Sequence, residues 1–193
     1  MNYEQKIKNN FSLEFFELCQ KFCLLLNQWN KIHSMTKAKS LEEIYENIYD
    51  SVYPLDFVGD FENFADIGTG AGFPGFAIAM AKPNIKAYLI EPRQKRAAFL
   101  NFAKNSLGLE NIVVVNSRVE DFKIDSNIDL ITSRAVADTD LLLKISSHLL
   151  TDKSKILFYK GSNIKDELQN IKYKYEVFDG EENRKYLLIK MEA

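Results

Sequence analysis

The chain has 193 residues, of which 46% are hydrophobic and 27% are charged, and its formal net charge is −2. This length fits one well-buried domain with a small extension, and no apolar run approaches the roughly 20 residues of a membrane helix. The balanced charge gives no general attraction for nucleic acid, so such a partner has to be argued from local clusters of lysine and arginine.

The first 60 residues have the pattern of a small helical cap. Apolar residues recur at helical spacing between residues 11 and 30, and a polar, basic loop follows over residues 30–39. Ser40 and Glu43 then form an S-x-x-E capping box, which predicts a second helix that ends near residue 53. The first residues lack the segments of a secretory signal, so we expect a cytoplasmic protein, without a membrane anchor.

The cysteines and histidines do not predict a metal site. Cys19 and Cys23 are four residues apart in the first helix, a spacing that fits buried apolar side chains better than a redox pair or half a zinc site. His33 and His148 each stand alone in the sequence, and a metal site needs several converging ligands. We therefore expect no metal.

From residue 61 onward, predicted strands and helices alternate, which indicates a mostly parallel sheet with helices on its faces. This domain would extend over residues 61–193. We expect five strands, ending at Asp66 and then at 86–90, 112–115, 128–132 and 156–159. Helices are expected at 74–81, 93–107 and from residue 139, with a short helix near 163–170. Two further strands, 173–178 and 186–189, would form a terminal antiparallel hairpin and complete a seven-stranded sheet.

The first strand leads into a loop that carries four of the chain's eight glycines, in the sequence DIGTGAGFPG over residues 66–75. Glycine adopts backbone angles that other residues avoid, and its missing Cβ lets a ligand lie against the main chain. Pro74 suits the first turn of the helix that follows. This loop has the character of the floor of a nucleotide-like site.

In an open α/β sheet, ligands bind beyond the carboxyl ends of the strands. Candidate site residues therefore follow each strand in turn: Asp66, Gly68 and Gly70, then Glu91, then Arg118, Val119 and Glu120, then Ser133 and Arg134. Glu91 comes after the glycine loop by about the spacing at which an acid binds ribose hydroxyls. A carboxylate can accept hydrogen bonds from both hydroxyls of a diol.

A dinucleotide site is one alternative, because residues 70–75 match G-x-G-x-x-G and would then belong to an NAD-linked oxidoreductase. Asp66 counts against it, since a carboxylate opposes a pyrophosphate but attracts a cationic ligand. The chain also has no second domain to present a hydride donor or acceptor. S-adenosylmethionine, which carries a ribose, an ammonium group and a sulfonium but no phosphate, fits these residues better.

Several motifs together resemble the RsmG family, formerly called GidB. These are DIGTGAGFPG at 66–75, K-R-x-x-F-L at 95–100, SRVE at 117–120, SRAVA at 133–137, Lys160-Gly161, and the block from Trp29 to Thr36 with Asp50-Ser51. The resemblance covers most of residues 25 to 161. Relatives tend to carry a basic residue and a histidine where this chain has Glu46 and Asn47.

The resemblance implies a bacterial enzyme with a Rossmann-like, class I methyltransferase fold. It would use S-adenosylmethionine to methylate N7 of one guanine (position 527, in the 530 loop) of 16S ribosomal RNA, within the small ribosomal subunit. Carried over by position, the cofactor residues would be Gly68, Phe73, Val119, Glu120 and Arg134. The argument from the strand ends adds Asp66, Gly70 and Glu91.

Guanine N7 has a free lone pair and no proton, so its methylation needs alignment of the reactants rather than a general base. We expect Arg134 to position the cofactor or the target base; the alternative is a structural ion pair with Asp66 or Glu120. Phe73 or Tyr53 could stack on an extruded base.

Basic residues around the predicted site are candidates for RNA contact. They are Lys31, Lys37, Lys39, Arg93, Arg96 and Arg118, with Lys95 and Lys104 as further members. Three other functions stay open: a methyltransferase of the same fold that acts on a protein or small molecule, an NAD-linked enzyme, and an RNA-binding protein without activity. We expect a monomer.

Overall fold

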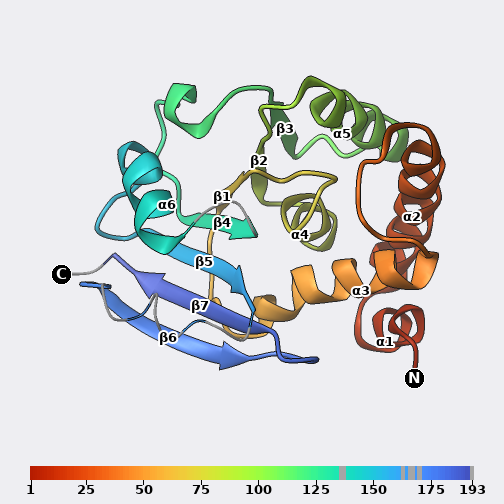
Figure 1. Ribbon diagram of the computed structural model, residues 1–193, viewed down its shortest axis with the longest axis horizontal. Helices are drawn as coiled ribbons and strands as arrows, with labels where there is room; N and C mark the ends of the chain where they lie inside the picture. Colours follow the sequence, from red (N-terminus) through yellow and green to blue (C-terminus); the bar gives the residue numbers. More distant parts are fainter. Residues whose placement is uncertain (135–137, 162–163, 165–167, 169–170, 192–193) are drawn as a thin grey trace.

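A computed structural model describes residues 1–134, 138–161, 164, 168 and 171–191. Its centre is a seven-stranded sheet with the strand order β3-β2-β1-β4-β5-β7-β6 (Figure 1). The strands are β1 (Asn63–Ile67), β2 (Lys86–Ile90), β3 (Ile112–Val115), β4 (Leu130–Arg134), β5 (Lys155–Lys160), β6 (Lys174–Asp179) and β7 (Lys185–Lys190). The first five strands are parallel, whereas β7 runs antiparallel to both of its neighbours.

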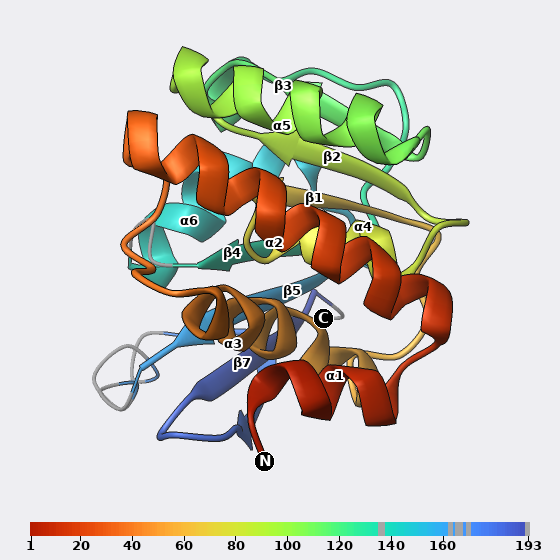
Figure 2. The ribbon, with the colours of Figure 1, turned by 90° about the vertical axis from the view of Figure 1, so that its right-hand side faces the viewer.

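Helices cover both faces of the sheet. They are α1 (Tyr3–Asn10), α2 (Leu13–His33), α3 (Leu41–Val52), α4 (Gly75–Ala81), α5 (Gln94–Leu107) and α6 (Thr139–Ser146), with short 3₁₀ segments η1 (Tyr53–Asp56), η2 (Val119–Asp121) and η3 (Ser147–Leu149). Helix α6 packs on one face and α4 and α5 on the other. Helix α3 lies beside α4 on that second face, against β5 and β7, and α2 packs over α3, α4 and α5 (Figure 2). None of the helices in the described ranges is long and apolar enough to cross a bilayer.

The N-terminal helices share one continuous core with α4 and α5. Phe22 of α2 is fully buried, stacks on Phe76 of α4 with ring centroids 4.6 Å apart, and meets the edge of Phe73 at 5.8 Å. Cys19 and Cys23 are buried in the same cluster, as predicted. The cap therefore supports the glycine loop from behind, and the division into residues 1–60 and 61–193 stays a prediction.

The predicted alternation of strands and helices is confirmed, and the ranges of the second and third strands match those of β2 and β3. The C-terminal hairpin is also confirmed, although its second strand, β7, lies inside the sheet and β6 forms the edge. The short helix predicted near 163–170 falls largely on residues outside the described ranges.

One helix was not predicted, and two boundaries differ from the prediction by more than one residue. Helix α1 was not predicted, because in its polar sequence only Ile7 is buried. Helix α2 extends to His33 rather than ending at residue 30, since Trp29 is anchored against Phe99 (ring centroids 5.4 Å apart) and the helix continues past it. Strand β4 begins two residues later than expected, because the Asp129 carboxylate accepts from backbone N–H groups beside β1.

Candidate functional site

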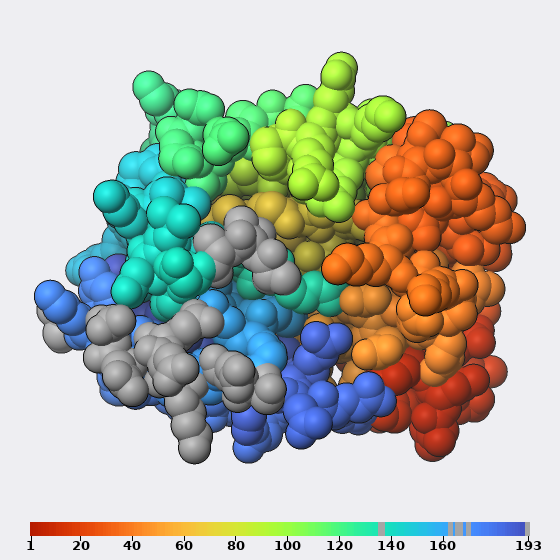
Figure 3. All heavy atoms as spheres, viewed as in Figure 1, coloured from red at the N-terminus to blue at the C-terminus, as the bar shows by residue number. Residues whose placement is uncertain are grey.

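A cleft of about 790 Å³ opens at the carboxyl ends of the strands. Its floor is the loop after β1, seen in gold in Figure 3 between α5 and the cap. The cap loop after α2, helix α3, the segment after β2, the end of β4 and the turn before β7 complete the walls. The lining residues are Met35, Thr36, Lys37, Ala38, Glu43, Glu46, Asn47, Gly68, Thr69, Gly70, Ala71, Phe73, Glu91, Pro92, Arg93, Arg96, Arg134 and Arg184.

The glycine loop presents its backbone to this cleft. Gly70 has a φ of +61°, which glycine adopts without strain, and a Cβ built on it would meet nothing closer than Arg96 Nη1 at 3.7 Å. Its N–H donates to Glu91 Oε2 (2.9 Å), and the N–H of Gly68 donates to the carbonyl of Ile90 (2.8 Å). The loop is thus tied to the end of β2, and among the described residues only Arg96 and Gly68 have atoms within 4 Å of the position of a Gly70 Cβ.

Glu91 is only 2% exposed, yet it lines the cleft. Its carboxylate accepts from the N–H groups of Gly70 and Arg93 (2.8 Å), and Arg96 Nη1 lies 3.8 Å from Oε2. An ionised carboxylate offers about four acceptor positions, so two N–H donors leave capacity for further hydroxyl groups. This placement agrees with the predicted ribose-binding role, which stays a prediction.

Asp66 has a different position from the one expected. Its side chain is fully buried beneath the loop and is not among the described residues that line the cleft. Oδ2 accepts from the N–H of Gly75 (2.8 Å) and Oδ1 from the hydroxyl of Thr132 (2.8 Å). Burial raises the pKa of Asp66 to about 6, although these hydrogen bonds lower it. The structure therefore places this carboxylate at the start of α4, where it fastens the helix to the sheet.

Arg134, the last residue of β4, faces the cap. Nη1 donates to Asn47 Oδ1 (2.9 Å) and lies 3.3 Å from Asp50 Oδ2, both on α3. The guanidinium carbon lies 5.2 Å from the centroid of the Phe73 ring. The suggested ion pairs with Asp66 or Glu120 are not the ones formed, because α3 supplies the carboxylate that lies closest.

The basic residues predicted to contact RNA lie in different places. Lys37, Arg93 and Arg96 line the cleft, and the last two also border a groove of about 280 Å³ that includes Lys95 and His33. Lys31, Lys39 and Arg118 are exposed outside the cleft lining. Lys104 donates to the carbonyl of Ile112 (2.7 Å), which engages it within the fold.

Val119 and Glu120 lie on η2, beyond the end of β3, and are not among the described cleft-lining residues. Their contact with adenine stays a prediction. Tyr53 stacks on Tyr186 (ring centroids 5.5 Å apart) and is not part of the lining either, so it is poorly placed to stack on a base in the cleft. Residues 135–137 of the SRAVA motif lie outside the described ranges.

The sequence did not identify the contribution of the cap and the hairpin. Asn47 and Arg184 line the cleft. Asp50 is not among the described lining residues, but it contacts Arg134, which is. The sequence of α3 indicates only an amphipathic helix of the cap, and Arg184 follows an acidic turn. Asp50 was noted only as part of a family-like motif, and nothing in the sequence predicted that these residues come together at the strand ends, because only the fold brings them there.

Comparisons with known proteins identify a family. The model of the GidB family, described as rRNA small subunit methyltransferase G, matches residues 16–190. A relative from Aliarcobacter butzleri, named ribosomal RNA small subunit methyltransferase G, is 50% identical over 184 residues and covers 94% of each chain.

Solved structures show the same fold at low identity. A putative S-adenosylmethionine-dependent methyltransferase from Methanococcus maripaludis superposes with a TM-score of 0.63 at 15% identity, covering 89% of this chain and 92% of its own. A mutant of MtNAS in complex with S-adenosylmethionine gives a TM-score of 0.60 at 13% identity, covering 90% and 72%. The fold is that of the class I methyltransferases, as the sequence predicted.

Proposed function

The chain belongs to the GidB family of small-subunit ribosomal RNA methyltransferases, and we propose that it methylates N7 of one guanine in the 530 loop of 16S ribosomal RNA. S-adenosylmethionine is the methyl donor. The observation that carries the proposal is the open backbone of Gly70 beside the buried Glu91, at the carboxyl ends of β1 and β2.

This arrangement suits a nucleoside without phosphates. A pyrophosphate would be bound by the N–H groups at the start of α4, but the N–H of Gly75 already donates to the Asp66 carboxylate. The strand order with β7 antiparallel also differs from the parallel 3-2-1-4-5-6 order of dinucleotide-binding domains. Both observations favour S-adenosylmethionine over NAD, with Gly68, Gly70 and Glu91 as the residues that would hold it.

When bound, the sulfonium supplies an activated methyl group with a good leaving group. Guanine N7 carries a lone pair and no proton, so no residue of the chain has to act as a base. The protein's contribution is orientation, which is worth roughly 7–11 kcal/mol in well-aligned systems. Arg134 and Phe73, which adjoin each other in the cleft, are the side chains we assign to holding the target base or the cofactor in place.

The exposed basic residues of the cleft lining are our proposed contact for the RNA backbone. Lys37 of the cap loop and Arg93 just before α5 line the cleft and are exposed, so that phosphates can reach them, whereas Arg96 of α5 lies 3.8 Å from Glu91. Two rival functions have to be tested against this proposal. One is methylation of a protein or a small molecule, and the other is RNA binding without enzymatic activity.

The test is incubation of the purified protein with S-adenosylmethionine that carries a labelled methyl group and with small ribosomal subunits from a strain lacking this gene. Label is then mapped by chemical cleavage at N7-methylguanine. One labelled guanine in the 530 loop is the expected result. Binding of S-adenosylmethionine without transfer to the subunit would refute the proposed substrate. Absence of binding would refute the proposed cofactor.

A further inference from the structure

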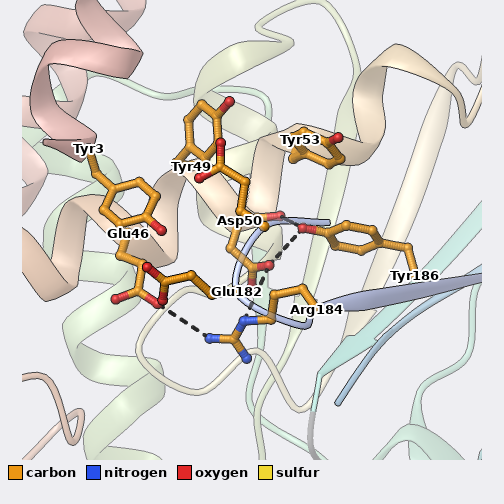
Figure 4. Close-up of a pocket in the computed structure, with 9 residues that line it drawn as sticks. Tyr3, Glu46, Tyr49, Asp50, Tyr53, Glu182, Arg184 and Tyr186 are labelled. Carbon is orange, nitrogen blue, oxygen red and sulfur yellow. Dashed lines mark hydrogen bonds and ion pairs between the residues drawn. The ribbon is translucent and has the colours of Figure 1, made fainter. Parts of the chain in front are cut away.

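The buried carboxylate of Asp50 joins three parts of the fold that are distant in the sequence. It lies on α3 and is 6% exposed. One oxygen, Oδ2, lies 3.3 Å from Nη1 of Arg134 at the end of β4. The other, Oδ1, accepts from the Tyr186 hydroxyl (2.8 Å) and lies 3.7 Å from Nε of Arg184, both from the hairpin (Figure 4).

Arg184 extends this network back to the cleft. Its Nη2 lies 3.7 Å from Glu46 Oε1, one turn before Asp50 on α3, and both Arg184 and Glu46 line the cleft. The two oxygens of Asp50 therefore serve two guanidinium groups, one on each side, and both of these groups reach the cleft wall.

We propose that Asp50 is a positioning residue for methyl transfer, which acts by fixing the guanidinium plane of Arg134. This inference rests on the proposed function. Asp50 and Asn47 both engage Nη1, and two acceptors on one nitrogen restrict rotation of a planar group. The Phe73 ring adjoins the same guanidinium. These contacts fix the orientation of the guanidinium, including its other edge, which carries Nη2 and Nε.

A purely stabilising role accounts less well for this cluster. A buried ion pair is weak evidence for stability, because the cost of desolvation offsets much of the attraction, and apolar residues of similar volume often serve as well. Asp50 instead lies at the meeting point of the cap, β4 and the hairpin, directly behind a cleft-lining cation. From that position, the Asp50 carboxylate connects three elements of the fold and fixes the orientation of the Arg134 guanidinium.

The experiment compares steady-state methylation of small ribosomal subunits by the wild type, Asp50→Asn, Arg134→Lys and the double variant. For Asp50→Asn we expect kcat to fall at least tenfold with KM for the subunit changed less than threefold. If Asp50 acts through Arg134, the double variant loses little more than Arg134→Lys alone, whereas independent effects would multiply.

Tyr159→Phe is the matched control. The Tyr159 hydroxyl donates to the backbone carbonyl of Ser51 (2.6 Å), next to Asp50, so its loss loosens the same helix. The substitution removes no hydrogen bond described for Arg134 and keeps the backbone pairing of Tyr159 with Arg134 between β5 and β4. We expect kcat within twofold of the wild type. If Asp50→Asn does not fold, Asn47→Ala replaces it, with a smaller fall in kcat that is also non-additive with Arg134→Lys.

Multiplicative losses, or an Asp50→Asn enzyme with wild-type kcat, would overturn the positioning role while leaving the proposed function intact. A fall in kcat for Tyr159→Phe equal to that of Asp50→Asn would assign the effect to helix stability, and would overturn it as well. No transfer by the wild type itself would instead refute the proposed substrate, and the inference with it.

Discussion

Asp66 and Glu91 show how the same chemical group serves two purposes at neighbouring strand ends. Both carboxylates are buried and both accept from backbone N–H groups of the glycine loop and its helix. Asp66 lies under the loop and holds the start of α4, whereas Glu91 borders the open cleft. The two carboxylates thus differ in depth: Asp66 is buried under the loop in a structural position, and Glu91 is placed where the proposed ligand could reach it.

Replacement of Glu91 by glutamine should weaken S-adenosylmethionine binding by about 10- to 100-fold, since a hydrogen bond to a charged group is worth about 1.5–3 kcal/mol. The amide also cannot accept from both Gly70 and Arg93 as the carboxylate does. Isothermal titration calorimetry measures the change. Glu110→Gln, an exposed acid just before β3, should bind like the wild type, and an equally unaffected Glu91→Gln would exclude the ribose role.

Asp66 predicts a specific dependence of stability on pH. Its pKa rises from 3.8 to about 6 on folding because the carboxylate is buried. A raised pKa means that the folded state binds the proton more tightly, so the contribution to stability is complete below pH 3.8 and is lost as pH rises through about 6. About two pKa units correspond to about 3 kcal/mol.

Asp66→Asn removes this titration. The free energy of unfolding of the wild type minus that of the variant should therefore fall by about 3 kcal/mol as the pH rises through this range. Urea titrations at a series of pH values give this difference, in which groups common to both proteins cancel. A difference that stays flat, or rises with pH, would show that the folded pKa is not raised.

Single residues were predictable where a strand end marked them. The position of Glu91 followed from its place after β2, and that of Arg134 from its place at the end of β4. The partner of Arg134 could not be inferred, because Asp50 is 84 residues away and approaches only once α3 packs against α4. Asp66 was misjudged because spacing along the chain does not reveal whether an acid lies above or below the loop.

At the level of elements, the junction of β1 and α4 depends on close contact. A Cβ on Gly75 would lie 2.5 Å from Leu89 Cδ2 and 2.6 Å from Asp66 Oδ2, so alanine cannot be accommodated without movement of the strand or helix. Gly75→Ala should cost about 1–3 kcal/mol of unfolding free energy, the usual range for overpacking. Urea denaturation measures it.

Gly161→Ala is the reference for that substitution. A Cβ there meets no atom of the described residues within 4 Å, so its stability should stay within about 0.5 kcal/mol of the wild type. Equal stability of the two variants would mean that α4 can move away from β1 at little cost. The position of the glycine loop would then not depend on this junction.

The contact of α2 with the glycine loop gives a second test at this scale. Phe22 is fully buried against Phe73 and Phe76, so Phe22→Ala should cost about 3–5 kcal/mol, as large-to-small core changes do. Leu24 lies on the same helix but is 54% exposed, and Leu24→Ala should stay within about 0.5 kcal/mol. Thermal and urea unfolding compare the two, and similar losses would refute the supporting role of α2.

The order of elements was predictable because the central strands are short apolar runs, α2 and α3 bury residues at helical spacing, and glycines mark the turns between elements. Helix α1 was not, since a helix that buries only Ile7 has no such stripe and owes its place to the cap. The position of β7 between β5 and β6 also could not be inferred from the sequence. A hairpin fixes which strands pair with each other, but not which of them joins the sheet.

Across the whole molecule, the cleft lining carries both signs of charge on each side. Arg93 and Arg96 lie beside Glu91, and Arg184 lies 3.7 Å from Glu46 of α3. A chain with a net charge of −2 has little long-range attraction for RNA, so affinity must come from exposed basic residues at short range. Lys37 and Arg93 are exposed residues of the lining.

The exposed side chains of Lys37 and Arg93 predict how RNA binding should depend on salt. If Lys37 and Arg93 each neutralise one phosphate, replacing either by alanine should reduce the slope of log K against log salt by about 0.7–1. Lys82→Ala, an exposed lysine just after α4, should leave the slope unchanged. Fluorescence anisotropy with an RNA that contains the 530 loop, over a series of salt concentrations, gives the three slopes. A wild-type slope near zero, or the same reduction for Lys82→Ala, would place RNA contact away from the cap loop and α5.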